Sequence, residues 1–130
     1  MKTEMLYLVL VASLTGLLWV PYVLNRMMVR GIPDTVGYPA QPRPLAAWAE
    51  RMKAAHSNAV ENLVVFAALI LAAQALGVSN SVTAGAAVLY FWARVVHVLA
   101  YTFAVPWVRT LAFVAGFAAQ AAVAWQVLAR

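Results

Sequence analysis

Ionisable and hydrogen-bonding residues interrupt several long apolar stretches of this sequence, and their spacing places them on common helix faces. One such stripe consists of Arg94, His97 and Tyr101, at positions i, i+3 and i+7 of an otherwise apolar segment. A charge in the middle of a bilayer costs roughly 2.5–3.5 kcal/mol on insertion scales. Because the sequence carries these residues despite that cost, they indicate a functional site if the segment spans a membrane.

A second polar stripe occurs earlier in the chain, in the first half of another apolar stretch. Its members are Arg51, His56, Asn58, Glu61 and Asn62. At about 100° per residue, Arg51 and Asn58 lie within about 20° of each other, and Glu61 lies about 60° further round the helix. A cation, an amide and a carboxylate therefore lie close together around the axis of this half-helix.

A third polar position is Arg109, near the start of the last apolar run and followed by Thr110. A cation at a helix start opposes the helix dipole, so a purely structural role is disfavoured there. Together the three segments direct basic, amide, phenol and carboxylate groups to one depth, which suits a small anionic or zwitterionic ligand. The two histidines lie on different helices without a carboxylate at ligand spacing, so we predict no metal site.

Each of these residues also has a structural alternative. Arg51 and Lys53 could extend their charged ends to lipid headgroups. Glu61 could neutralise Arg94 in an ion pair that fixes the packing of two helices. His56 could lie at the membrane interface without a role, and His97 and Tyr101 could be hydrogen-bonded packing residues.

The composition predicts the environment of these residues. The chain has 130 residues, of which 65% are hydrophobic and only 10% charged, and its mean hydropathy is +0.83. Soluble domains are about half apolar and about a quarter charged, so we predict an all-α integral membrane protein. The net charge of +5 does not indicate a nucleic-acid partner, because the basic residues neither cluster nor interleave with aromatic residues.

Four apolar runs are long enough to cross a bilayer, which takes about 20 residues. We predict a single domain, 1–130, with helices at about 5–24, 45–76, 82–103 and 107–128. Glycine and proline residues predict a loop over 25–44, and Gly77 is expected to cap the second helix. The first run is too long for the apolar part of a signal peptide, and Glu4 interrupts the positive start that such a peptide needs.

Basic residues are divided unequally between the two sides of this four-helix arrangement. The side with the loops after the first and third helices carries Arg26, Arg30, Arg43, Arg51, Lys53 and Arg109. The side with both termini carries only Lys2 and Arg130. By the positive-inside rule we expect the richer side, and with it the polar site, to face the cytoplasm.

Three segments resemble motifs of the MAPEG superfamily, the membrane-associated proteins in eicosanoid and glutathione metabolism. Glu50–Asn62 shares the second-helix motif of Glu-Arg, Ala-His, and asparagine with glutamate three residues later. Arg94–Tyr101 resembles the third-helix stripe, and Arg109-Thr110 resembles an arginine–hydroxyl pair at the start of the fourth helix. The resemblance covers nearly the whole chain and implies a MAPEG-like four-transmembrane-helix bundle that assembles as a homotrimer.

By this resemblance the chain looks like a bacterial-type microsomal glutathione transferase, in the inner membrane and in contact with membrane lipid. Glutathione would be the cosubstrate, and the reaction would be its transfer to a lipophilic electrophile or the reduction of hydroperoxides. Arg109 and Thr110 would activate the thiol. The residues implied in glutathione binding are Arg26, Arg51, His56, Asn58, Glu61, Arg94, His97 and Tyr101.

The chain also departs from the family pattern. Ala54 and Ser57 stand where a catalytic member has arginines, and the spacing from Tyr101 to Arg109 is one residue shorter. These departures leave open a non-catalytic member that binds lipid or glutathione, resembling the five-lipoxygenase-activating protein. A small multidrug transporter is disfavoured, because such proteins need a carboxylate midway along the first helix and Met5–Leu24 has none.

Overall fold

The computed structural model describes residues 1–130 and consists of helices joined by short connections. The helices are α1 Thr3–Leu17, α2 Trp19–Val36, α3 Ala47–Ala75, α4 Ser81–Thr102 and α5 Val108–Leu128. Four of them are long and apolar enough to cross a membrane when α1 and α2 are taken as one interrupted rod, Thr3–Val36. The prediction of an all-α bundle with four membrane-spanning helices is confirmed.

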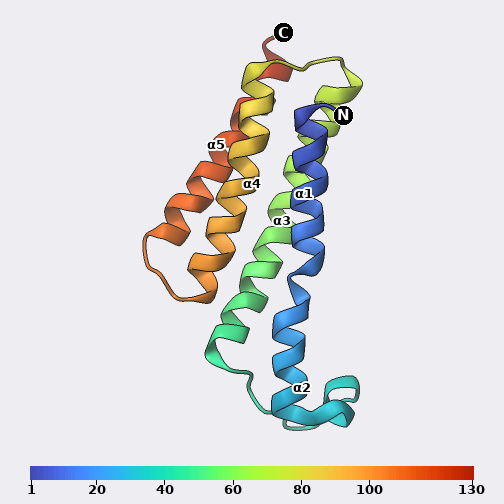
Figure 1. The fold of residues 1–130 in the computed structure, drawn as a ribbon, viewed down its shortest axis with the longest axis vertical. Helices are drawn as coiled ribbons and strands as arrows, with labels where there is room; N and C mark the ends of the chain where they lie inside the picture. The colour runs from blue at the N-terminus through green and yellow to red at the C-terminus, as the bar shows by residue number, and fades with distance from the viewer.

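The helices lie side by side in two groups (Figure 1). The α1–α2 rod runs beside α3, and α4 and α5 form a hairpin that leans against them. Both termini and the α3–α4 turn lie at one end, which we call the turn end. The α2–α3 connection and the α4–α5 loop lie toward the opposite end, which we call the loop end.

The first helix is much longer than the sequence predicts, because the expected loop over 25–44 is helical as far as Val36. Gly31 has a φ of 78° and interrupts the helix without ending it. Pro33 follows in the first turn of the resumed helix, where its missing N–H leaves no hydrogen bond unmade. Thr35 Oγ1 donates to the carbonyl of Gly31 at 2.8 Å and closes this turn. The glycine and proline therefore redirect the helix here instead of terminating it.

The turn between α3 and α4 has the local structure that the sequence predicts. Gly77 adopts a φ of 72°, and the N–H of Val78 donates to the carbonyl of Ala73 at 2.8 Å, the pattern of a Schellman cap. Asn80 begins α4 with a capping box, in which its side chain accepts from the backbone of Thr83 and the Thr83 hydroxyl accepts from the backbone of Asn80. Both helix ends are thus satisfied within six residues of chain.

The apolar core lies along α4, which contacts α1, α3 and α5. Its centre is the stack of Phe66 on Tyr90, with ring centroids 3.9 Å apart and planes only 5° from parallel. Leu8, Val11 and Val123 pack around this pair from α1 and α5. Large apolar side chains cover the outer faces of the bundle, as lipid contact requires. Polar residues of α4 are therefore the best shielded in the molecule.

Glu4 provides a polar contact at the turn end that the sequence did not suggest. Its carboxylate is buried and accepts hydrogen bonds from Ser79 Oγ at 2.9 Å and Thr83 Oγ1 at 2.7 Å. Beside it, Asn80 Nδ2 donates to Gln126 Oε1 at 2.9 Å. These bonds connect the start of the chain, the α3–α4 turn and the end of α5.

Candidate functional site

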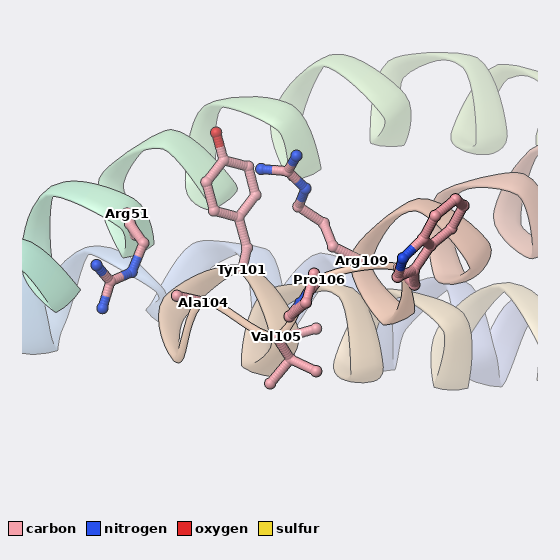
Figure 2. A pocket seen from close by; sticks show the side chains of 8 residues that line it. Arg51, Tyr101, Ala104, Val105, Pro106 and Arg109 are labelled. Carbon is pink, nitrogen blue, oxygen red and sulfur yellow. The ribbon is translucent and has the colours of Figure 1, made fainter.

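A polar cavity of about 270 Å³ lies between α3, α4 and α5 in the half of the bundle near the loop end. We call its lining the first face, which comprises Asn58, His97, Tyr101, Arg109, Thr110 and Phe113. A second cavity, of about 360 Å³, shares Tyr101 and Arg109 and extends along the α4–α5 loop to Arg51 (Figure 2). Five residues predicted as site residues thus meet at one cavity.

The Arg109 guanidinium lies over the ring of Tyr101, with its central carbon 4.6 Å from the ring centroid. Figure 2 shows the two side chains extending in the same direction from α4 and α5, with the phenol oxygen and the guanidinium at the same level. The cation–π contact fixes the otherwise flexible arginine. Its charged end remains exposed to the cavity.

The start of α5 carries backbone N–H groups that have no hydrogen-bond partner. The capping position is occupied by Trp107, whose side chain accepts no hydrogen bond from the helix. Among the first-turn groups, the N–H groups of Arg109 and Thr110 make no backbone hydrogen bond, whereas that of Leu111 donates to Trp107. Free N–H groups at a helix start, with the positive end of the helix dipole, favour an anion. The charge of Arg109 adds to this positive potential.

Arg94 is the buried cation behind the first face, with only 4% of its surface exposed. Its Nη2 donates to Asn58 Oδ1 at 2.7 Å. Asn62 Nδ2 donates to the same oxygen at 3.3 Å, and Gln120 Nε2 donates to the carbonyl of Asn62 at 3.1 Å. A chain of neutral amides therefore holds the Arg94 side chain in place.

The ion pair between Glu61 and Arg94, considered from the sequence, is absent from the structure. Glu61 is exposed and points to a different side of α3. The reason is the rotation of α3, in which Ala55 and Ala59 pack into the core and place Asn58 opposite Arg94. The 60° between Asn58 and Glu61 is enough to take the carboxylate off this face.

Two buried nitrogen atoms near the first face have no hydrogen-bond partner within the chain: Arg94 Nε and His97 Nδ1. The His97 side chain is 2% exposed and packs edge-on against Tyr101, with ring centroids 5.8 Å apart. Buried polar atoms are nearly always paired with protein, water or ligand. The wall of the cavity thus has hydrogen-bonding capacity that the chain itself does not use.

A separate cavity of about 400 Å³ lies between α2 and α3. We call its lining the second face, which comprises Tyr22, His56, Ser57, Val60 and Glu61. The Tyr22 hydroxyl and His56 Nδ1 are 2.7 Å apart and hydrogen bonded. The sequence analysis missed Tyr22, although its place four residues before Arg26 on an apolar helix is a detectable signal. Two predicted site residues, His56 and Glu61, lie on this face and not on the first.

Arg26 and Arg51 lie outside both faces. Arg26 is on α2, and its buried Nε has no partner. Arg51 Nε donates to the backbone carbonyl of Thr102 at 2.9 Å. Arg51 lies at one end of the 360 Å³ cavity, and the Tyr101–Arg109 contact lies at the other. The predicted site residues therefore do not form one cluster within a single chain.

A comparison with known protein families matches residues 8–129 to the MAPEG family. No curated protein and no solved structure matches the chain. The matched residues include the first membrane-spanning helix from Leu8 onward, the other three in full, and every residue of both faces. The predicted resemblance is confirmed, and the chain belongs to the MAPEG family.

Proposed function

We propose that this protein is a membrane-embedded glutathione transferase in which Arg109 and the start of α5 stabilise the glutathione thiolate. The observation that carries the proposal is the Arg109 guanidinium, held over the Tyr101 ring at a polar cavity that Arg109 and Thr110 line, on a helix start where the N–H groups of these two residues are free. Three sources of positive potential meet there: a fixed cation, two backbone donors and a helix dipole. A developing or permanent anion is the species that such an arrangement stabilises.

The donor set suits glutathione, an anionic tripeptide with two carboxylates, two amides and a thiol. Asn58, Tyr101 and Thr110 offer neutral hydrogen-bonding groups around the cavity, and Arg109 offers charge. His97 lines the cavity and its unpaired Nδ1 adds hydrogen-bonding capacity for the polar backbone of the ligand. Arg94 does not line the cavity and acts from behind, by holding Asn58 in position.

The chemistry follows from the charge on Arg109. A free thiol has a pKa near 8.5, so it is mostly protonated at neutral pH. A guanidinium within about 4–6 Å lowers the pKa of an acid by about 1–3 units, and an arginine cannot lose its charge in return. Thr110 donates a hydrogen bond to the sulfur. The thiolate then attacks a lipophilic electrophile that arrives through the bilayer, and the leaving group departs with its electron pair.

The second face has a place in this proposal if subunits assemble as a homotrimer, which the family resemblance implies. His56 and Glu61 line a different cavity from Asn58, on another face of α3. Against a neighbouring subunit they would complete its site with a carboxylate and the Tyr22–His56 pair. The split between the two faces supports an intersubunit site, with Glu61 available for the glutathione ammonium group.

The deciding experiment measures the ultraviolet absorbance of the thiolate as glutathione is added to the purified protein at neutral pH. We expect a thiolate signal that saturates with glutathione in the wild type and is lost in Arg109→Ala. Arg130→Ala, an exposed arginine at the turn end, is the matched control and should keep the signal. Saturable glutathione binding without any thiolate signal would identify a non-catalytic glutathione-binding member. No glutathione binding at all would overturn the transferase proposal and leave the lipid-binding alternative.

A further inference from the structure

An apolar groove of about 350 Å³ opens on the outer surface of the bundle near the loop end, away from both faces. It is lined by Leu14, Leu18, Pro21, Trp48, Met52, Val95, Val98, Leu99, Thr102 and Phe103. These residues come from the α1–α2 rod, the start of α3 and the last part of α4. Thr102 is the only lining residue with a hydroxyl group, so the groove offers almost exclusively carbon surface.

The groove lies against the interruption between α1 and α2. The N–H of Leu18 donates to Thr15 at 3.3 Å, a tightened turn, and the α2 helix resumes at Trp19. Pro21 has no N–H to continue the hydrogen-bond pattern of α1 across this point. Leu18 and Pro21 therefore line a break in the rod (Figure 1), where a straight helix would present a continuous surface.

A cation sits beside the groove at its end nearest the start of α3. Arg51 Nε donates to the backbone carbonyl of Thr102 at 2.9 Å, which holds the guanidinium next to a residue that lines the groove, although Arg51 itself lines the neighbouring 360 Å³ cavity. Arginine has five N–H donors, and the other four make no hydrogen bond within the chain. The neighbouring carboxylate of Glu50 is engaged elsewhere, because it accepts from the N–H of Leu45 at 3.2 Å. No salt bridge neutralises Arg51.

We propose that this groove binds one acyl chain of an anionic phospholipid of the surrounding bilayer, with Arg51 pairing its phosphate. The polarity of the site matches that of the ligand, because a carbon-lined groove extends from Leu14 and ends beside an unpaired guanidinium. A phosphate takes two parallel N–H bonds from a guanidinium, and the free edge of Arg51 supplies them. Trp48 and Phe103, both exposed at this level, suit the membrane–water interface where the phosphate would lie.

The charge distinguishes this ligand from other occupants of the groove. A neutral lipophilic molecule would fill the groove without using Arg51. A second copy of this chain would exclude lipid from Trp48 altogether. The groove shares no residue with the first or the second face, and of the residues that the proposal uses only Arg51 was also implied in glutathione binding.

The experiment uses Trp48 as a reporter from inside the groove. The four other tryptophans, Trp19, Trp92, Trp107 and Trp125, are replaced by phenylalanine, and the protein is placed in nanodiscs. Phosphatidylglycerol or phosphatidylcholine with brominated acyl chains is then added at equal mole fraction, because bromine quenches nearby indole fluorescence. One cation near the surface is worth about 1 kcal/mol with an anionic lipid, so we expect about fivefold preferential quenching by phosphatidylglycerol.

Arg51→Gln should abolish this preference, and Lys53→Gln, an exposed cation two residues along the same helix, should keep it. A variant with only Trp125, exposed near the turn end and outside the groove, should show no comparable preference. If the Trp48 variant does not fold, native mass spectrometry makes the comparison instead. It counts the phosphatidylglycerol molecules retained per subunit by the wild type and by Arg51→Gln. Equal quenching by both lipids, quenching by neither, or a preference that survives Arg51→Gln would each overturn the proposal.

Discussion

Arg94 donates a hydrogen bond to Asn58 at 2.7 Å, so the partner of the buried cation is a neutral amide and not the carboxylate of Glu61. Removing the amide leaves a guanidinium nitrogen unsatisfied in a low-dielectric setting. Asn58→Ala should therefore lower the free energy of unfolding by about 1–3 kcal/mol. Thermal unfolding in detergent measures the change.

A double-mutant cycle separates the two candidate partners of Arg94. Asn58→Ala and Arg94→Met should be coupled by about 0.5–3 kcal/mol, because the two residues are in contact. Glu61→Gln and Arg94→Met should be additive. The reverse pattern, with Glu61 coupled and Asn58 additive, would mean that α3 is rotated differently in the assembled protein.

Arg109 should control the rate through the ionisation of the thiol. In the proposed mechanism Arg109 lowers the pKa of bound glutathione, so its contribution to the rate should be present below the ordinary thiol pKa, near 8.5, and should vanish above it. In Arg109→Ala, transfer to 1-chloro-2,4-dinitrobenzene at pH 7 should fall about tenfold or more, and the loss should shrink as pH rises past 9. A pH–rate profile with glutathione saturating measures this.

Arg109→Lys is the informative companion variant, because it keeps the charge but changes reach and geometry. We expect an intermediate rate and an intermediate apparent pKa. Glutathione affinity, followed by calorimetry, should fall in either variant only by the part that came from stabilising the thiolate, because Asn58, His97 and Tyr101 remain. A collapse of affinity together with rate would make Arg109 a clamp for a glutathione carboxylate instead.

The intersubunit site can be tested by complementation. Arg109→Ala damages the first face and Glu61→Ala the second, so each alone should be poorly active. Subunits carrying different changes, coexpressed, should regain activity where an intact first face meets an intact second face. Arg109→Ala mixed with Tyr101→Ala is the control, because both changes lie on the first face and no intact first face remains. Restoration in the control, or none in the test mixture, would contradict an intersubunit site.

The loop end should face the cytoplasm, because six of the basic residues counted above lie on that side. The chain has no cysteine, so single cysteines at Asp34 and Asn80 report each end without interference. An impermeant maleimide added outside intact cells should label position 80 and not position 34. Labelling of position 34 alone would reverse the orientation and remove the access of cytosolic glutathione.

Features set by a few neighbouring residues could be predicted from the sequence. The cap at Gly77 is one, because a positive φ after a helix depends on local chemistry. The course of α2 could not be predicted, since Gly31 and Pro33 are compatible with either a loop or a redirected helix. Only the packing of the rest of the chain distinguishes the two.

The candidate site shows the same limit at the level of side chains. Helical spacing correctly grouped His97 with Tyr101, because residues four apart always share a face. The partner of Arg94 depends instead on how α3 is rotated about its axis, and that rotation is set by which small residues, Ala55 and Ala59, enter the core. Spacing along one helix contains no information about that choice.

The length of the α1–α2 rod has a consequence for handling the protein. The rod has 34 residues, and its part before the redirection at Gly31 rises about 40 Å at 1.5 Å per residue, whereas the hydrocarbon layer is only about 30 Å thick. We therefore expect the redirected turn after Gly31 and the chain around Tyr38, which is fully exposed, to stand clear of the lipid. A fluorescent domain or affinity tag inserted there would be carried in water, joined to a segment that tolerates added length at little entropic cost.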